Sequence, residues 1–251
     1  MTELQIPQGF CRNLPTSANA IAIFDNWVCA LPILGALGGS AQIFLPDQDP
    51  RPSYARDVFG SLEQFDVLEL GSLEGGHSYQ LERLGVKSIT GIEANAESFL
   101  KSLIIKEVLE LKARFLYGDF VKYLETVKTR YDLIFACGVL YHMTDPLHLL
   151  HLISRRTDRV FIWTHYVSIE DARNFAEYVD VDRHGFKCRY YKNFYDPNHN
   201  TRRYSGLEGY SCLLLKDDIL RALAHLQFEK IHVMKDDARE TGSSLSIIAH
   251  R

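Results

Sequence analysis

Residues 67–78, VLELGSLEGGHS, constrain the fold of this chain more than any other segment. An apolar run over 65–70 ends in a glycine-bearing turn, and helical spacing of apolar residues follows over 78–84. Glycine adopts positive φ at little cost and lets backbone N–H groups approach a ligand closely. A helix that starts at such a turn directs its unpaired N–H groups toward that ligand. The stretch therefore predicts a strand, turn and helix that bind a nucleotide-type cofactor.

The spacing of the glycines selects the class of cofactor. A dinucleotide loop, G-x-G-x-x-G, requires glycine two residues after Gly71, but Leu73 stands there. Glu69, Gly71 and Gly75 instead form the pattern acidic-x-Gly-x-x-x-Gly, which resembles the first motif of class I S-adenosylmethionine-dependent methyltransferases. The resemblance implies S-adenosyl-L-methionine as cofactor and S-adenosyl-L-homocysteine (SAH) as product, with these three residues and Ser72 at the cofactor site.

From residue 65 onward, strand patterns alternate with helical patterns, as in a parallel sheet with crossover helices. We expect strands over 65–70, 88–93, 113–117, 131–136 and 159–164, and helices over 78–84, 96–109, 120–126 and 145–154. A helix over 216–226 and two strands over 228–234 and 245–249 follow. This ending resembles the antiparallel finish of the class I methyltransferase sheet. The sequence thus predicts an α/β, Rossmann-like, doubly wound seven-stranded sheet with a terminal antiparallel hairpin.

The expected domain organisation is an N-terminal extension over 1–60 and a methyltransferase domain over 61–251. The extension either packs on the core, which is the favoured interpretation, or forms a lid over the cofactor or substrate. The residues that would serve a lid are Phe24, Trp27, Tyr54 and Arg56.

An insertion over 166–210 interrupts the alternation after the fifth strand. We expect a short helix over 169–178 and then an irregular stretch rich in tyrosine and basic residues. Aromatic walls and basic side chains suit an acceptor with an aromatic or acidic portion; the alternative is a solvated loop with tyrosines packed on the core. We expect Arg202 and Arg203 to affect binding of the acceptor and not of the cofactor. The residues concerned are Tyr190, Tyr191, Phe194, Tyr195, Tyr204, Tyr210, Lys187, Arg189, Lys192, Arg202 and Arg203.

Glu93 ends the second expected strand, 22 residues after Gly71. A carboxylate at this place in a nucleotide-binding fold accepts the hydroxyl protons of a ribose. The alternative is a solvated charge at the start of a helix. The preceding turn favours the ribose role.

Asp119 and Phe120 follow the third expected strand. In the resembled family, an acid here holds the adenine amino group and its apolar neighbour covers the ring. Asp119 is also a suitable N-cap for the next helix, and the two roles are compatible.

The fourth strand and its end carry the letters YDLI, GVLYH and DPL over residues 131–147. These letters are similar to class I methyltransferases, and most closely to the group that contains tRNA wobble-uridine carboxymethyltransferases and related small-molecule enzymes. The resemblance covers about residues 64–164. It implies that Cys137 lies beside the methionine part of the cofactor, and that Tyr141 and His142 line the reaction centre.

His142 and His165 are the candidate catalytic residues. The resembled reaction needs an acceptor held in line with the methyl group, and a hydroxyl or protonated amine also needs a base. Imidazole suits proton removal near neutral pH, and we rank His142 first. The alternatives are that His142 caps the next helix and that His165 bonds to a neighbouring loop. A carboxylate acceptor would need neither base.

Two residues of the glycine turn depart from a simple assignment. Glu74 adds negative charge to a turn that the resemblance places near the methionine carboxylate, and its role stays open. His77 is left as a loop or cofactor-side residue.

Composition limits the partners. A net charge of −4 and a pI near 6.2 give no overall basic excess, so we expect nucleic acid to be an unlikely partner. The five cysteines form no C-x-x-C pair, so no metal site is expected. No signal peptide or membrane span is evident, which predicts a cytoplasmic protein.

The function that these features predict is S-adenosylmethionine-dependent methyl transfer to an oxygen atom of a small-molecule acceptor. The alternatives are a tRNA-base (carboxy)methyltransferase and a non-catalytic cofactor-binding scaffold. The acceptor, any modification of the cofactor and the oligomeric state are left open.

Overall fold

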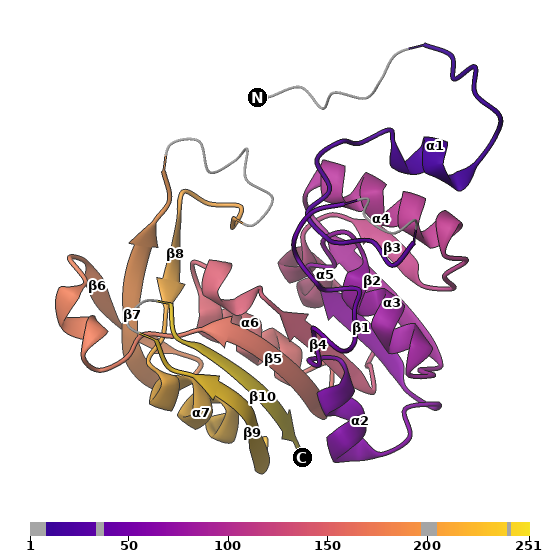
Figure 1. The fold of residues 1–251 in the computed structure, drawn as a ribbon. Coiled ribbons are helices and arrows are strands. Elements are labelled where there is room, and N and C mark those ends of the chain that lie inside the picture. Colours follow the sequence, from indigo (N-terminus) through magenta and orange to yellow (C-terminus); the bar gives the residue numbers. More distant parts are fainter. Residues whose placement is uncertain (1–8, 34–37, 197–204, 240–241) are drawn as a thin grey trace. The chain divides into compact units, whose positions relative to one another are not determined.

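A computed structural model describes residues 9–33, 38–196, 205–239 and 242–251. Its main feature is a seven-stranded sheet with the order β3-β2-β1-β4-β5-β10-β9 (Figure 1). The pairs β2–β3, β1–β4 and β4–β5 are parallel, whereas β10 runs antiparallel to both β5 and β9. The predicted α/β fold with an antiparallel finish is therefore confirmed. Its strands are β1 Asp66–Leu70, β2 Ser88–Glu93, β3 Arg114–Tyr117, β4 Leu133–Cys137, β5 Arg159–His165, β9 Lys230–Asp237 and β10 Ser244–His250.

The strand boundaries differ from the predictions by a few residues at most. The largest difference at a strand start is two residues, at β4, expected from residue 131 and beginning at Leu133, and at β9, expected from residue 228 and beginning at Lys230. Tyr131 forms only an isolated bridge to Thr157, and the continuous ladder with β5 starts at Ile134. The middle of β4 is fully buried, and Phe135 stacks on Phe161 with ring centroids 4.4 Å apart.

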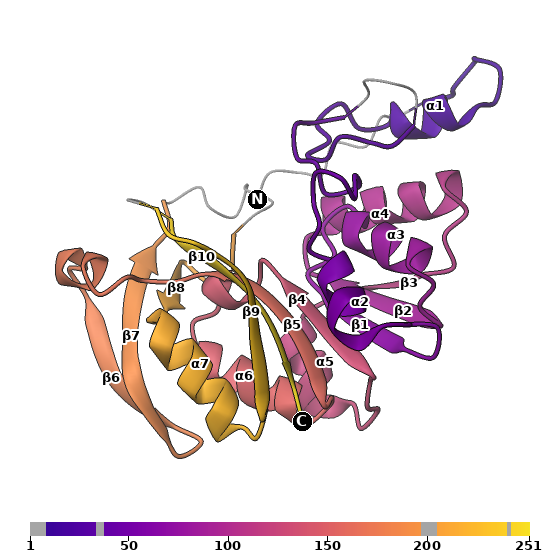
Figure 2. The same ribbon diagram turned by 60° about the horizontal axis from the view of Figure 1, so that its bottom comes forward.

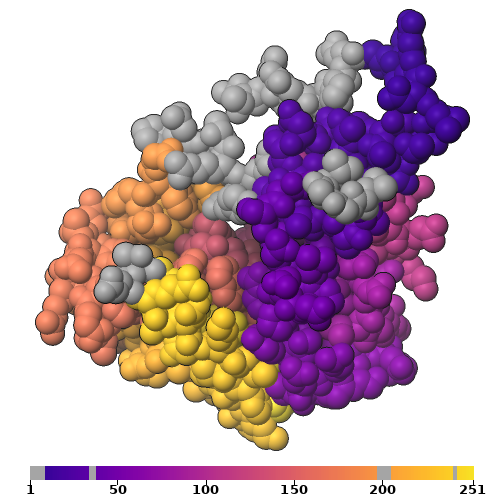
Figure 3. Space-filling view, in the orientation of Figure 1, coloured from indigo at the N-terminus to yellow at the C-terminus, as the bar shows by residue number. Residues whose placement is uncertain are grey.

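The chain divides into two compact units, and the first comprises residues up to 65 together with 72–119. It contains β2, β3 and four helices. α3 and α4 pack on β2 and β3, and α1 contacts α4. The indigo N-terminal residues and the magenta residues of α4 are both visible on the surface of this unit (Figure 3). The helices are α1 Ser17–Ile21, α2 Ser53–Phe59, α3 Gly76–Arg83 and α4 Ala96–Val108.

The second unit comprises residues 66–71 and 120–251. Asp145 caps α6 through its carboxylate, which accepts the His148 N–H at 3.1 Å, and this explains why the helix begins one residue after the predicted start. The helices are α5 Phe120–Thr126, η1 Leu140–His142, α6 Pro146–Ser154, η2 Asp171–Asn174 and α7 Lys216–His225.

The insertion contains a second sheet, so its expected irregular structure is wrong. Three antiparallel strands have the order β6-β7-β8, and only η2 is helical within the helix expected over 169–178. The turn between β6 and β7 is His184-Gly185, and both residues have positive φ, 53° and 76°. Such a two-residue turn matches the twist of a hairpin. The strands are β6 Tyr178–Arg183, β7 Phe186–Phe194 and β8 Tyr210–Leu213.

The small sheet is joined to the rest of its unit through α7. This helix contacts both β7 and β9 and lies between them in Figure 2. Arg221 lies over the Phe186 ring at 5.2 Å, and His225 Nε2 is 3.0 Å from the His184 carbonyl oxygen. The two ends of the insertion also meet, because the Val167 N–H donates to the Leu214 carbonyl at 2.9 Å.

None of the helices among the described residues is long and apolar enough to cross a bilayer.

Candidate active site

The glycine turn after β1 has an unusual backbone. Gly71, Leu73 and Gly75 all have positive φ, 69°, 50° and 85°. Positive φ is uncommon for a residue such as leucine, so the turn must be held by its surroundings. The Leu73 N–H donates to Glu93 Oε2 at 2.7 Å. This hydrogen bond fixes the turn against the carboxyl end of β2.

Glu93 is a buried carboxylate at the end of β2, 8% exposed. Its Oε1 accepts the Asn95 N–H at 2.7 Å. Burial raises the pKa of Glu93 to about 7, although hydrogen bonds from the N–H groups of Asn95, Leu73 and Ala94 act in the opposite direction. A carboxylate offers about four lone-pair positions, so these three donors leave room for a ligand hydroxyl. The site thus fits the ribose role expected for Glu93, which remains a prediction.

Ser72 supplies a second polar group at the turn. Its N–H donates to the Ile92 carbonyl at 3.2 Å, whereas its hydroxyl is buried and has no hydrogen-bond partner among the described residues. Unpaired buried hydroxyls are uncommon in folded proteins. The turn therefore fits a polar ligand, as the cofactor assignment requires.

The other expected cofactor residues lie at the ends of their strands. In the first unit, Glu93 pairs in register with Tyr117, and the Gly118 N–H donates to the Glu93 carbonyl at 2.9 Å, which brings Asp119 to the same edge. In the second unit, Glu69 lies within β1 opposite Phe135 and is buried. Phe120 is buried at the start of α5.

Glu74 does not extend toward a ligand. Both of its carboxylate oxygens accept the Val28 N–H, at 2.9 and 3.1 Å, and Oε2 accepts the Cys29 N–H at 2.8 Å. Lys101 Nζ lies 3.2 Å from Oε1, and neither side chain is exposed. The Glu74 carboxylate, whose role the sequence left open, therefore binds the backbone of the N-terminal segment.

Two of the aromatic residues that would serve a lid, Phe24 and Trp27, lie in the same anchor. Each is 7% exposed, their ring centroids are 6.4 Å apart, and Lys101 Nζ lies 5.3 Å from each centroid. This packing favours the first interpretation of the N-terminal extension, as a segment packed on the core.

The second unit brings four rings together at the ends of β4 and β5. We call Tyr141, His142, Trp163 and His165 the aromatic cluster. The Tyr141 ring lies 4.1 Å from the His142 ring and 4.6 Å from the His165 ring, and the Trp163 ring lies 5.1 Å from His165. Cys137 is buried opposite Trp163 in the β4–β5 ladder. The structure thus groups Cys137, Tyr141, His142 and His165 as expected, and adds Trp163, which the sequence shows only as one apolar residue of a strand.

His142 is held by the insertion. Its Nδ1 lies 2.8 Å from the Tyr195 hydroxyl oxygen. A Cβ at Gly206 would lie 2.4 Å from the His142 carbonyl oxygen, so the backbones pack closely here. Burial, with a smaller contribution from His165, lowers the pKa of His142 to about 4. This imidazole is therefore neutral near pH 7.

His165 has a defined tautomer. Its Nδ1 lies 3.1 Å from the Gly242 carbonyl oxygen and 3.2 Å from that of Ser243. Carbonyl oxygens only accept hydrogen bonds, so Nδ1 carries the proton. In the neutral ring, Nε2 then has a lone pair and acts as an acceptor.

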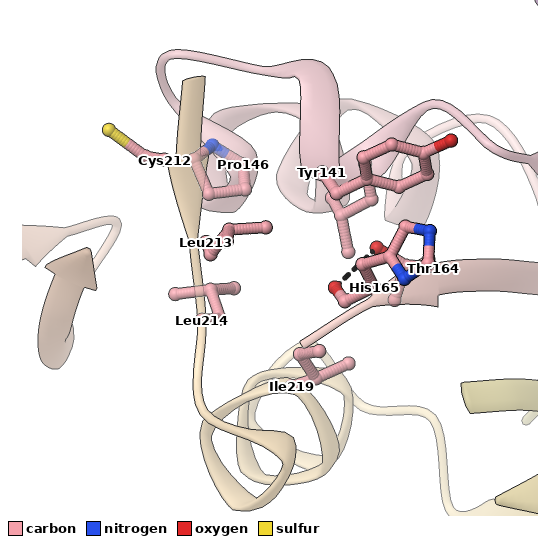
Figure 4. Close-up of a pocket in the computed structure, with 9 residues that line it drawn as sticks. Tyr141, Pro146, Thr164, His165, Cys212, Leu213, Leu214 and Ile219 are labelled. Carbon is pink, nitrogen blue, oxygen red and sulfur yellow. Dashed lines mark hydrogen bonds between the residues drawn. The ribbon is translucent and has the colours of Figure 1, made fainter. Parts of the chain in front are cut away.

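A narrow apolar gap lies beside the cluster, between β5, β8 and α7 (Figure 4). The Cys212 sulfur points away from it. Its size and leucine-rich lining suit side-chain packing more than acceptor binding. The lining residues are Leu140, Tyr141, Pro146, Thr164, His165, Cys212, Leu213, Leu214 and Ile219.

The basic side chains of the insertion differ from the expected anion fork. Arg189 forms two hydrogen bonds to Asp180, at 2.7 and 3.0 Å, and Lys192 lies 3.3 Å from Glu177. These cations pair with carboxylates of β6 and of the residue just before it. The pairing corrects the expectation that they hold an acidic acceptor group. Lys187, which is also part of that expectation, lies 3.8 Å from Asp182. Arg202 and Arg203, and also Tyr204, lie outside the described residues.

No family model matches this chain. The chain does match curated proteins named "tRNA U34 carboxymethyltransferase". The protein from Nautilia profundicola is 32% identical over 91 residues, which cover 36% of this chain and 30% of that protein. The one from Campylobacter fetus subsp. fetus is 29% identical over 117 residues, which cover 45% and 41%. The chain thus matches less than half the length of these relatives.

Solved structures match over far more of the chain. The N-terminal domain of EvdMO1, crystallised with SAH and D-fucose, superposes with a TM-score of 0.72 over 93% of this chain and 94% of that one, at 20% identity. The magnesium protoporphyrin IX methyltransferase of Synechocystis PCC 6803, with bound SAH, gives 0.55 over 81% of each chain at 15% identity. This chain has the class I S-adenosylmethionine-dependent methyltransferase fold.

The methyltransferase fold confirms the resemblance predicted from the glycine turn and the strand endings. The enzyme class and the S-adenosylmethionine cofactor agree with both comparisons.

The expectation about nucleic acid is wrong. It rested on overall charge, but the curated relatives that this chain resembles are named as tRNA-modifying enzymes. Net charge averages over the whole surface and does not report on a local site.

Proposed function

We propose that this protein is an S-adenosylmethionine-dependent methyltransferase that methylates a hydroxyl oxygen. Bound S-adenosylmethionine supplies an electrophilic methyl group on its sulfonium. The observation that carries the cofactor assignment is Glu93, buried at the end of β2, bonded to the N–H of Leu73 in the turn and able to accept a further donor. The unpaired Ser72 hydroxyl supports the same assignment.

The aromatic cluster supports a hydroxyl acceptor. A hydroxyl is a weak nucleophile until its proton is removed, so an O-methyltransferase benefits from a positioned base. His165 fits this role because its Nδ1 is fixed by two carbonyl oxygens, which leaves Nε2 to take the proton. The neighbouring rings of Tyr141 and Trp163 hold the imidazole in place.

His142 suits a different task. A pKa of about 4 makes it a poor proton acceptor near neutral pH. A neutral imidazole still carries one N–H and one lone pair, so it orients an acceptor by hydrogen bonding. We therefore reverse the order that the sequence suggested, and assign His165 as base and His142 as orienting group.

The acceptor that we favour is a small polyhydroxylated molecule. The neighbour with the highest TM-score quoted above was crystallised with D-fucose, a sugar that offers several hydroxyl groups. A hydroxyl acceptor also suits a cluster that combines an imidazole base with flat apolar rings.

A tRNA base is the second candidate. The curated relatives named as tRNA U34 carboxymethyltransferases favour it, and they make a carboxylated cofactor an alternative to test.

The test begins with mass spectrometry of any ligand that co-purifies, which separates S-adenosylmethionine from a carboxylated form by mass. The protein is then incubated with methyl-labelled S-adenosylmethionine and either a panel of sugars and phenols or unfractionated tRNA. Label in a sugar or phenol supports the favoured acceptor, and label in tRNA supports the second.

Cofactor binding without turnover on any acceptor would indicate the non-catalytic scaffold. Failure of SAH to bind, measured by calorimetry, would refute the assignment. The role of Glu93 is tested by the affinity of Glu93→Gln for SAH. Glu82→Gln is its matched control, because Glu82 also accepts hydrogen bonds from backbone N–H groups, those of Lys112 and Ala113, but away from the turn.

A further inference from the structure

We propose that Glu74 and Lys101 are positioning residues that couple the cofactor turn to the N-terminal segment, so that the two become ordered together. The proposal rests on the proposed function, because it assumes that the turn binds the cofactor. It concerns contacts within the first unit only.

The coupling starts from two adjacent residues that face different partners. The Leu73 N–H donates to Glu93, and the side chain of the next residue, Glu74, accepts from Val28 and Cys29. A shift of the segment at residues 28 and 29 would therefore move the peptide that contacts Glu93.

Lys101 completes the anchor. Its ammonium group has three N–H donors, and three acceptors surround it: Glu74 at 3.2 Å, Glu97 at 3.0 Å and the Asn26 carbonyl at 2.8 Å. The ammonium group also lies 5.3 Å from the ring centroids of Phe24 and Trp27, two aromatic residues of the segment. The charge is held by two hydrogen bonds, to Glu74 and to the Asn26 carbonyl, and by an ion pair with Glu97. Movement of Lys101 would break these contacts at a buried charge, which is costly.

A second set of contacts holds the same face of the turn and α3. His77 Nε2 lies 3.0 Å from Asp49 Oδ2, and Gln80 Nε2 donates to the Ile43 carbonyl at 2.6 Å. His77 and Gln80 are three residues apart on α3 and so lie on one face of the helix, and Glu74 lies in the turn just before it. That face of the turn and helix is therefore occupied by the N-terminal segment.

The N-terminal segment and α3 are closely packed. A Cβ at Gly76 would lie 2.7 Å from Ile43 Cγ2, so the segment sits directly on the first residue of α3. The Ser72 hydroxyl and the Leu73 N–H, which donates to Glu93, take no part in these contacts with the segment. The N-terminal segment thus acts as a backing for the turn, and loss of the anchor should weaken cofactor binding without removing any cofactor contact.

The test uses the full chain with Glu74→Gln and Lys101→Met combined, because the double variant removes the buried ion pair without leaving the charge of either partner unpaired. Glu97, which also contacts Lys101, is 22% exposed and can be solvated. Lys106→Met, on the same helix and outside the anchor, is the control. We measure the Kd of SAH by calorimetry, and amide hydrogen exchange at residues 26–30 and 72–76 with and without SAH.

In the unmodified protein, SAH should slow exchange in both segments. In the double variant, the Kd should rise roughly 5- to 150-fold, the usual range of coupling between two sites, and exchange at residues 26–30 should no longer respond to SAH. The control should match the unmodified protein. An unchanged Kd in the double variant, or no effect of SAH on residues 26–30 of the unmodified protein, would overturn the proposal.

Failure of the proposed function has a separate signature, because SAH would then not bind the unmodified protein at all. In that case the ligand-free exchange data decide. Faster exchange at Leu73 in the double variant supports the coupling, and exchange equal to that of the control contradicts it.

Discussion

Tyr195 and His142 share a hydrogen bond of 2.8 Å across 53 residues of sequence. Tyr195 belongs to the insertion, between β7 and β8, and His142 ends η1 after β4. The orientation of one candidate site residue is therefore set by the segment that the sequence predicted to form the acceptor pocket.

Removing that hydrogen bond should slow turnover. Tyr195→Phe leaves a buried imidazole nitrogen unpaired, at a cost of about 1–3 kcal/mol. We expect kcat to fall by roughly tenfold, since His142 loses its fixed orientation, and the Kd of SAH to stay the same. Steady-state kinetics and calorimetry check this. Tyr191→Phe, in the adjacent strand β7, is the control, and equal losses in both variants would count against a specific role for Tyr195.

Substitution of His142 and of His165 by asparagine should change the kinetics in different ways. His165→Asn keeps an N–H donor for the carbonyls of Gly242 and Ser243 but has no group that takes a proton near pH 7. We expect kcat to fall roughly 100-fold or more, with partial rescue by added imidazole. His142→Asn should raise the acceptor KM and reduce kcat by less. A larger kcat loss at His142, or no rescue at His165, would restore His142 as the base.

Cofactor affinity should depend on pH through Glu93. The ionised carboxylate is the better acceptor for ribose hydroxyls, and the raised pKa of about 7 means that protons compete with the ligand below that pH. The Kd of SAH should therefore rise as pH falls from 7 toward 5, by up to about tenfold per pH unit. Calorimetry across this range tests the dependence. Glu93→Gln should bind more weakly, about 10- to 150-fold, with a flat profile, and a sloping profile in this variant would implicate another group.

His142 should contribute a loss of stability in mild acid, which the raised pKa of Glu93 opposes. The folded pKa of His142, about 4, lies below the unfolded value of about 6.5, so the unfolded chain binds more protons as pH drops below 6.5. For this residue alone, the loss reaches about 2 kcal/mol at pH 5. His77, whose pKa is also lowered by burial, acts in the same direction. Urea unfolding of both proteins between pH 7.5 and 5 measures the effect as a difference. The stability of the unmodified protein should fall relative to that of His142→Asn as the pH decreases.

The sequence was most informative where local pattern and function coincide. β2 has the predicted bounds because its buried apolar residues end at one acidic residue, Glu93. The turn, Glu93 and Asp119 could be aligned because each follows a strand, and parallel strands bring their carboxyl ends to one edge.

Other features depended on distant partners. The role of Glu74 could not be predicted, since the groups that it binds, Val28, Cys29 and Lys101, are 27 to 46 residues away. β6 was missed because its polar alternation, YVDVDR, is that of an exposed edge and resembles a loop. The lowered pKa of His142 depends on burial, which no local spacing indicates.

The hydrogen bond from Val167 to Leu214 has a consequence for how such a protein diversifies. Because the first and last residues of the insertion are neighbours, the number of residues between 167 and 214 can change without changing the strand pairing of the seven-stranded sheet. A segment from another protein could replace residues 168–213 while β5, β10 and β9 keep their register. Substrate range in this architecture would then evolve by exchange of one contiguous segment, without remodelling of the scaffold.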